Sequence, residues 1–284
     1  MIAVTGATGH LGQLVIAELI AKGTNPKEII AIIRNRAKAQ NLISKGIEIR
    51  EADYKSEEAL EKALTGVNQL VMISGSEVGQ RVQQHTNIVN AAKKAHVKYI
   101  AYTSILKADT SKMLLAKEHL ATEQLIQATG IPYSFLRNGW YIENYTEQLK
   151  GALEHGAIAG SAKNGKISAA TRADYAAAAV AAVKKAAPHA IYELGGEAFT
   201  MSELAAVVSR VSGKKVEYKD LPSSEYAQML MGFGVPQGFA EVLADSDIGI
   251  TRGDLYTEST DLRNLIGRAP ASLESAVQAA VTKI

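Results

Sequence analysis

The sequence contains no cysteine among its 284 residues, which excludes disulfides, thiolate nucleophiles and cysteine-ligated metals. Its six histidines are scattered without the spacing of metal ligands, so we expect no metal site. No apolar run approaches the roughly 20 residues that a membrane helix needs. The net charge is only +2, and acidic and basic residues are interspersed. These absences argue against a membrane span, a lipid-binding surface and a nucleic-acid-binding surface.

What is present is the composition of an ordinary globular protein, with 47% hydrophobic residues. The length suits one large α/β domain, alone or with a smaller lobe. The chain begins directly with an apolar run at residues 2–4, so we expect no targeting segment and a cytoplasmic protein.

A glycine-rich loop follows this apolar run, and an amphipathic stretch begins behind it. Strand, glycine turn and helix is the order in which a glycine fingerprint binds a dinucleotide. Glycine permits a tight turn, close approach of the backbone to a pyrophosphate and close packing of helix on strand, and the helix N-terminus favours phosphate. An ordinary strand-to-helix turn is the alternative. The predicted cofactor-binding residues of the loop are Gly6, Ala7, Thr8, Gly9, His10, Leu11 and Gly12.

Short apolar strands alternate with helices over the first half of the chain. This is the pattern of βαβ units and predicts a Rossmann-type, doubly wound parallel sheet of the α/β class. Its ligand crevice should lie at the carboxyl ends of the strands. We expect strands at 28–34, 47–54, 68–75, 97–104 and 131–137, the second of them near a sheet edge, and helices at 56–64, 79–95 and 111–128.

The alternation loosens after residue 138. We expect residues 1–138 to form the NADP-binding domain, with 166–196 returning to it, and 139–165 with 197–284 to form a substrate-side lobe over the crevice. This lobe should be small and mostly helical, and no independent domain. We expect a loop and helix over 138–155, a turn at 161–165, helices at 171–187, 200–212, 223–233, 237–244 and 272–282, and strands at 191–194 and 215–221.

Arg34 ends the second expected strand, about twenty residues beyond the last glycine, where an NAD enzyme places an acid on the ribose. The position is basic here, and Arg36 and Lys38 follow. A guanidinium can pair with a 2′-phosphate, which a carboxylate would repel. The sequence therefore favours NADP over NAD, with a solvated arginine as the alternative.

Small or polar residues end the third and fourth expected strands. Asp53 could accept a hydrogen bond from an adenine amino group or could cap a turn. Ser74, Gly75 and Ser76 would allow the backbone to approach the cofactor closely. Glu77, next along the chain, is interpreted as a solvated acid at a helix start.

The fifth strand ends at Tyr102, at a position where a reductase often keeps a hydroxyl near its substrate. The Tyr-x-x-x-Lys proton donor of many reductases is missing, because Met113 stands four residues before Lys117. Lys117 could reach a nicotinamide ribose or be a solvated charge. His119 could be a proton donor or a partly buried structural residue. Tyr102, Lys117 and His119 are the candidate catalytic residues.

An aromatic segment leaves the sixth strand at its carboxyl end and could form an apolar slot for a flat ligand beside the nicotinamide. In the alternative, Trp140 anchors the lobe to the sheet. Arg172 could reach a phosphate or pair with an acid such as Asp174. The segment consists of Asn138, Gly139, Trp140, Tyr141, Ile142 and Glu143.

Over nearly its whole length the chain resembles the NmrA-like branch of the atypical short-chain dehydrogenases, most closely its NADPH-dependent quinone-reducing members. The motifs that carry the resemblance are TGATGHLG, AIIRN, SGSEVGQR, AYTS, LRNGWYIENY and ATRADYAAAA. The resemblance implies NADP contacts at residues 6–11, Arg34, residues 74–76, residues 138–143 and Arg172. The branch also contains triphenylmethane dye reductases and redox sensors that catalyse nothing.

The missing dyad fits an acceptor that needs no strong general acid. A reduced ketone becomes an alkoxide that needs a proton at once, whereas a quinone gives a delocalised anion and a cationic dye gives a neutral product. We therefore expect hydride transfer from NADPH to a small, flat, hydrophobic quinone. Dye reduction, which an acid such as Glu143 or Glu77 in the slot would favour, and cofactor sensing stay open, as does a homodimer.

Overall fold

The computed structural model describes residues 1–284. The chain divides into two compact units, each built from three segments. Unit 1 comprises Met1–Ser104, Glu118–Arg137 and Tyr175–Tyr192, and unit 2 comprises Ile105–Lys117, Asn138–Asp174 and Glu193–Ile284. The expected assignment of cofactor and substrate to separate parts of the chain stays a prediction.

A seven-stranded sheet has the order β3-β2-β1-β4-β5-β6-β8. The central strand β1 pairs in parallel with both β2 and β4, so the chain builds the sheet first to one side of β1 and then to the other. This confirms the doubly wound α/β fold, and β3 lies at the sheet edge as expected. The strands are β1 (Ile2–Val4), β2 (Ile29–Ile33), β3 (Glu48–Glu51), β4 (Gln69–Met72), β5 (Tyr99–Ile105), β6 (Tyr133–Asn138) and β8 (Ala190–Leu194).

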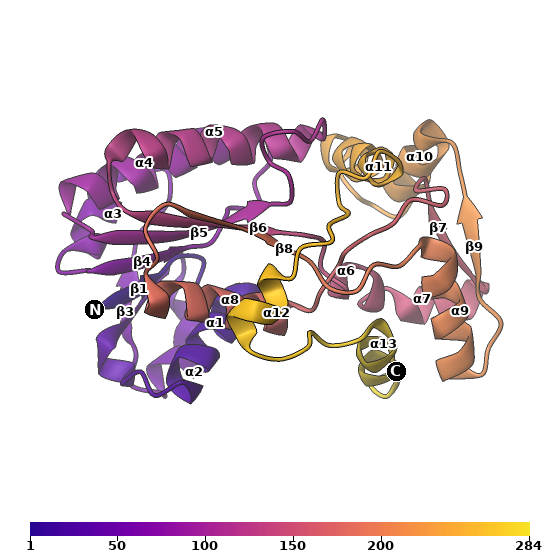
Figure 1. Ribbon diagram of the computed structural model, residues 1–284, viewed down its shortest axis with the longest axis horizontal. Coiled ribbons are helices and arrows are strands. Elements are labelled where there is room, and N and C mark those ends of the chain that lie inside the picture. Colours follow the sequence, from indigo (N-terminus) through magenta and orange to yellow (C-terminus); the bar gives the residue numbers. More distant parts are fainter. The chain divides into compact units, whose positions relative to one another are not determined.

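Helices cover both faces of this sheet, with α3, α4 and α5 along one face and α1 and α8 along the other (Figure 1). All five residues of β2 are therefore buried, as expected for a parallel strand covered on both sides. The helices here are α1 (His10–Ala21), α2 (Gln40–Ile43), α3 (Glu57–Leu64), α4 (Arg81–Lys94), α5 (Leu114–Thr129) and α8 (Arg172–Lys185), with short 3₁₀ turns at Pro26–Glu28 and Arg36–Ala39.

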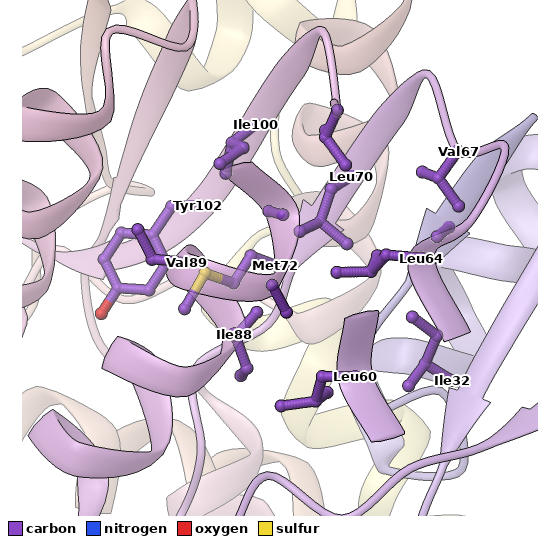
Figure 2. Packing of buried hydrophobic residues seen from close by; sticks show 14 of the residues in the cluster. Ile32, Leu60, Leu64, Val67, Leu70, Met72, Ile88, Val89, Ile100 and Tyr102 are labelled. Carbon is purple, nitrogen blue, oxygen red and sulfur yellow. The ribbon is translucent and has the colours of Figure 1, made fainter. Parts of the chain in front are cut away.

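The main core of unit 1 fills the space between this sheet and α3 to α5. Figure 2 shows its aliphatic side chains from α3, α4 and the strands packed together with the ring of Tyr102. Ser56 caps α3, because its hydroxyl accepts a hydrogen bond from the Ala59 N–H at 3.2 Å. No helix in the protein is long and apolar enough to cross a membrane.

Unit 2 carries most of the remaining helices and a two-stranded parallel sheet of β7 and β9. The second hydrophobic core of the protein lies in unit 2 and includes residues from α6, α7, α9 and α13. Its elements are α6 (Glu143–Thr146), α7 (Leu149–His155), β7 (Ala157–Gly160), α9 (Met201–Ser212), β9 (Glu217–Asp220), α10 (Ser223–Gly232), α11 (Gln237–Thr251), α12 (Asp261–Ile266) and α13 (Leu273–Val281).

Three features of unit 2 differ from the expectation. The strand β7 was not expected, since AIAG is short and its partner lies far along the chain. The helix α11 continues to Thr251 instead of ending at Ala244, because the acidic residues there bond to distant backbone groups rather than ending the helix. The short helix α12 was also missed.

Candidate functional site

The carboxyl ends of β1, β2 and β4 lie level with one another. Val4 is in register with Ala31 on one side and Val71 on the other. Ala7, Arg34 and Ser74 each lie three residues beyond these registered positions. The topology therefore places these three predicted cofactor residues together at the carboxyl end of the sheet in unit 1.

The glycine loop has the geometry that its sequence predicts. Gly6 has a φ of +60°, which favours glycine, and its carbonyl accepts the Gly9 N–H at 2.9 Å. A Cβ on Gly12 would lie 2.3 Å from the Gly6 oxygen, so only glycine fits there. Helix α1 begins with neither a side-chain cap nor an acidic residue in its first turn, which leaves its positive end available to an anion.

Tyr54 stands beside this loop and was missed in the sequence. Its hydroxyl lies 3.5 Å from where a Cβ on Gly6 would be, and it is buried without a hydrogen-bond partner. Burial raises the pKa of the Tyr54 phenol to about 12, so the group is a hydrogen-bond donor at neutral pH. Its sequence gives no signal, because Tyr54 is a single aromatic residue after a short strand.

Arg34 reaches across the carboxyl end of β1 to Glu77. Its guanidinium donates to one carboxylate oxygen of Glu77, and the other oxygen accepts from Gln84 Nε2 at 2.9 Å. The hydrogen bonds from Gln84 and Arg34 lower the pKa of Glu77. Glu77 is thus an ion-pair partner rather than a free acid. Asp53 is exposed, and its Oδ1 caps a turn by accepting the Lys55 N–H at 2.8 Å.

The turn after β4 is held by side chains from two elements, β5 and α4. The Ser74 N–H donates to Thr103 Oγ1 at 2.9 Å. The Gly75 N–H donates to His85 Nε2 at 3.0 Å, and the Gly75 carbonyl accepts from Arg81 Nε at 2.8 Å. Ser76 is exposed. The backbone of this turn is therefore fixed in place.

His85 holds the turn as a neutral ring. Burial lowers its pKa to about 3, so Nε2 can accept from Gly75 while Nδ1 donates to Thr122 Oγ1 at 2.8 Å. Arg81 in turn pairs with Glu118 at 3.0 Å. We predicted no role for His85 from the sequence, because its partners lie on other elements.

The structure joins two of the three candidate catalytic residues to each other. Tyr102 is fully buried, and its hydroxyl lies 2.8 Å from Nδ1 of His119, which is also buried. Burial raises the pKa of Tyr102 and lowers that of His119, so both are neutral. This burial favours the structural alternative for His119, and a role in catalysis stays a prediction. Lys117 is exposed on α5.

In unit 2 the segment 138–143 is anchored through its backbone. The Gly139 N–H donates to Leu194 O at 2.8 Å and the Ile142 N–H to Ala170 O at 3.1 Å. Trp140 is half-buried and packs against the unit 2 core. The buried atoms Asn138 Oδ1 and Glu143 Oε2 have no hydrogen-bond partner.

Arg172 lies against this segment. Its guanidinium stacks over the Tyr141 ring, 5.2 Å from the centroid, and the backbone N–H of Arg172 donates to Glu143 Oε1 at 2.8 Å. The guanidinium pairs with Glu147. The suggested pairing with Asp174 is wrong, because Asp174 pairs with Arg268 at 2.7 Å.

Buried polar atoms without hydrogen-bond partners occur both beside the glycine loop and in the segment after β6. Four buried side-chain atoms in the protein lack a hydrogen-bond partner: Tyr54 OH, Asn138 Oδ1, Glu143 Oε2 and Tyr145 OH. An unpaired buried group costs about 1–3 kcal/mol and calls for an explanation such as a ligand. Three of the four lie within residues 138–145, and the fourth lies beside the glycine loop. In each unit, the residues present thus suit a ligand group rich in donors and acceptors, as the groups of a dinucleotide are. The structure contains no cluster of three or more metal-ligating side chains.

Comparisons with known proteins agree with this geometry. A model of the NmrA-like family matches residues 1–278. Quinone oxidoreductase 2 of Escherichia coli K12 is 50% identical over 279 residues, which cover 98% of this chain and 97% of that protein.

Two solved structures have nearly the same fold. The NADPH-dependent quinone oxidoreductase of E. coli, in complex with NADPH, aligns with a TM-score of 0.95 at 50% identity, over 98% of this chain and 99% of that one. The triphenylmethane reductase of Citrobacter sp., in complex with NADP(H), aligns with a TM-score of 0.94 at 41% identity, over 99% of this chain and all of that one (100%).

Proposed function

Because the chain belongs to the NmrA-like family, we propose that it is an NADPH-dependent oxidoreductase that passes hydride to a quinone-type acceptor. The observation that carries this proposal is the 50% identity, over nearly the full length of both chains, to a quinone oxidoreductase. The glycine loop and the basic Arg34 position support the choice of cofactor independently.

In unit 1 the proposal assigns the adenosine and pyrophosphate end of NADPH to residues at the strand ends. Residues 6–12 would hold the pyrophosphate through backbone N–H groups and the α1 N-terminus. Arg34 would exchange Glu77 for the 2′-phosphate. The fixed turn at 74–76 would approach the ribose and pyrophosphate, Asp53 would lie near the adenine, and the Tyr54 hydroxyl would gain a partner.

In unit 2 the proposal assigns residues 138–143 and Arg172 to cofactor binding and to the wall of the acceptor slot. Asn138 Oδ1 and Glu143 Oε2 would gain the partners that they lack. When bound, NADPH supplies the hydride, and the protein holds a flat acceptor in line with it and excludes water.

The candidate catalytic residues keep limited roles in this proposal. Tyr102 and His119 would support the sheet end from within the core, and exposed Lys117 would be the one available to the nicotinamide ribose.

The proposed acceptor is small, flat and hydrophobic, and we place the protein in the cytoplasm. A homodimer completes the proposal, and light scattering on a sizing column would test it.

The decisive assay follows NADPH absorbance with a benzoquinone, a naphthoquinone, a triphenylmethane dye and no acceptor, with NADH in parallel. We expect turnover with the quinones. Turnover with the dye alone would favour the second candidate, dye reduction, which the likeness to triphenylmethane reductase supports. Silence with NADPH still bound would contradict both enzymes and leave a sensor.

Cofactor choice is tested by Arg34→Ala. A hydrogen bond to a charged group contributes about 1.5–3 kcal/mol, so NADPH binding should weaken by about 10- to 100-fold, with little change for NADH. Arg36→Ala, an exposed neighbour, is the matched control. Equal losses for the two cofactors would contradict Arg34 as the 2′-phosphate ligand.

A further inference from the structure

A second group of polar side chains lies within unit 2, and the proposed function gives a role to none of them. Tyr145 comes from α6, Tyr218 from β9, Tyr226 from α10 and Asp247 from α11. A Cβ on Gly160 would touch Asp247 Oδ2 and lie 3.2 Å from the Tyr218 hydroxyl, and Tyr145 and Tyr218 pack against the same core. Burial raises the pKa of all three phenols, and the Asp247 carboxyl adds to this. Four separate elements therefore bring one carboxyl group and three phenols together.

Asp247 is held by the backbone at one oxygen only. Its Oδ2 accepts the Ser161 N–H at 2.7 Å, and a Cβ on Gly160 would lie 2.8 Å from the same oxygen. The close approach of β7 thus fixes the carboxyl group and leaves Oδ1 without a hydrogen bond. Burial raises the pKa of Asp247 to about 6. The nearby carboxylate of Asp220 also raises this pKa, whereas the hydrogen bond from Ser161 lowers it.

Two of the three phenols have no hydrogen-bond partner in the protein. The Tyr145 hydroxyl is buried without a partner, although the ring itself packs edge-on against Phe199. Tyr226 is half-buried, and its hydroxyl donates to no protein group. Burial raises the pKa of both phenols, so both stay protonated donors.

Tyr218 belongs to the same group, but its hydroxyl has hydrogen-bond partners in the protein. Its hydroxyl donates to Asp220 Oδ1 at 3.0 Å and accepts the Ala162 N–H at 2.8 Å. Asp220 also accepts the Lys163 N–H at 2.8 Å. The Tyr218 hydroxyl thus has both a donor and an acceptor partner, whereas the Tyr145 and Tyr226 hydroxyls and Asp247 Oδ1 have none.

Tyr145 connects this group directly to the segment assigned to the cofactor. Tyr145 lies two residues beyond Glu143 in the same helix α6, and Ile142 and Tyr145 pack in the same core. Three unpaired buried atoms thus follow one another along residues 138–145. A ligand that pairs with Asn138 Oδ1 and Glu143 Oε2 would therefore lie next to a second ligand that pairs with the Tyr145 hydroxyl.

We propose that Tyr145, Tyr226 and Asp247 form the polar end of the acceptor site, where the two phenols bind an oxygen of the quinone and Asp247 supplies its proton. This inference rests on the proposed function. It gives the reaction the acid that the missing Tyr-x-x-x-Lys dyad leaves unassigned.

The step balances as follows. NADPH gives a hydride, with both electrons, to the quinone and becomes NADP⁺, and the quinone becomes a hydroquinone anion. The proton of the Asp247 carboxyl moves to the anionic oxygen, and the neutral hydroquinone leaves. The Asp247 carboxylate then takes a proton from solvent. Hydrogen bonds from two protonated phenols stabilise the charge while it is on the oxygen.

Asp247→Asn tests the proton step. The amide can still accept the Ser161 N–H but cannot deliver a proton. We expect kcat with a quinone at pH 6 to fall by about tenfold, below the usual range for a general acid because the anion is delocalised. We also expect the wild-type decline in kcat above pH 6 to disappear, while NADPH affinity stays unchanged. Glu241→Gln, exposed on the same helix α11, is the matched control.

Tyr145→Phe tests the binding step in a variant that removes only an unpaired hydroxyl. We expect KM for the quinone to rise by about three- to tenfold, with an unchanged or higher Tm. Tyr256→Phe is the control, because its hydroxyl is satisfied by Glu258 at 2.7 Å. A lower Tm with unchanged KM would show that a bridging water, and no acceptor, pairs with Tyr145, and would overturn the inference.

The outcomes separate the inference from the proposed function. Wild-type protein that reduces no quinone overturns both. Wild-type protein that reduces quinones, with an unchanged pH profile in Asp247→Asn and an unchanged KM in Tyr145→Phe, overturns the inference alone. If Asp247→Asn does not fold, Tyr145→Phe decides.

Discussion

Two buried tyrosines, Tyr102 in unit 1 and Tyr145 in unit 2, have the same chemistry and opposite surroundings. The Tyr102 hydroxyl is paired with His119 at 2.8 Å inside the core, whereas the Tyr145 hydroxyl is buried with no partner. Burial raises the pKa of both phenols. A raised pKa alone therefore does not mark a functional group, and the missing partner is what distinguishes Tyr145.

The same difference extends to the neighbours of each tyrosine. Near Tyr102, the ring of His85 is hydrogen-bonded at both nitrogens and fixes the Gly75 turn. Near Tyr145, Asp247 is bonded at one oxygen only. The first group is complete as it stands and serves to hold backbone in place. The second leaves the Tyr145 hydroxyl without a partner and Asp247 with one bonded oxygen.

The largest effect that would sharpen this comparison concerns Asp247 and pH. Its pKa in the folded protein, about 6, lies above the ordinary 3.8, so the folded state holds an extra proton between these values. Each tenfold change in proton affinity is worth about 1.4 kcal/mol, which makes the penalty at neutral pH at most about 3 kcal/mol. The penalty is full above pH 6 and is relieved as the pH falls towards 4.

We therefore expect the free energy of unfolding of the wild type to rise relative to Asp247→Asn between pH 7 and pH 4, measured by urea denaturation. Glu241→Gln should run parallel to the wild type. Parallel curves for Asp247→Asn and the wild type would mean that this carboxyl group carries no penalty.

An intermediate effect is expected for Tyr102→Phe. The variant leaves Nδ1 of buried His119 without a partner, which should lower the free energy of unfolding by about 1–3 kcal/mol. Urea denaturation at neutral pH measures it, with Tyr256→Phe as the control. A loss within experimental error would remove the distinction between a paired and an unpaired phenol.

The smallest effect is expected for Tyr145→Phe. Since no hydrogen bond is lost and an unpaired hydroxyl leaves the interior, the free energy of unfolding should stay the same or rise by up to about 1 kcal/mol. The same denaturation series measures it. A destabilisation as large as that of Tyr102→Phe would show that the two environments are alike.

The sheet and one end of the site could be predicted because their signals are local. Glycine spacing, the basic residue after β2 and the alternation of strands and helices each lie within a short window of the sequence. The 50% identity to a known oxidoreductase then confirms the family that the motifs suggested.

The rest depends on partners far along the chain. Leu114 and Ser161 donate backbone N–H groups to Asp245 and Asp247 at 2.7 Å, across separations that no sequence window covers. The predicted helix therefore ends at Ala244, whereas the observed helix continues to Thr251. Tyr54 and Tyr145 were missed for a related reason, because the lack of a partner is visible only in three dimensions.

The division of each unit into three segments affects how the protein is made. The chain passes between the units five times, with its last segment of unit 1 at Tyr175–Tyr192. Strand β6 ends at Asn138, but β8, which covers its free edge, begins only at Ala190. During synthesis the growing sheet therefore exposes an apolar, unpaired strand edge until the second half of the chain has left the ribosome. Slowing translation over this interval should favour aggregation of the nascent chain, and chaperones that shield strand edges should matter most at this stage.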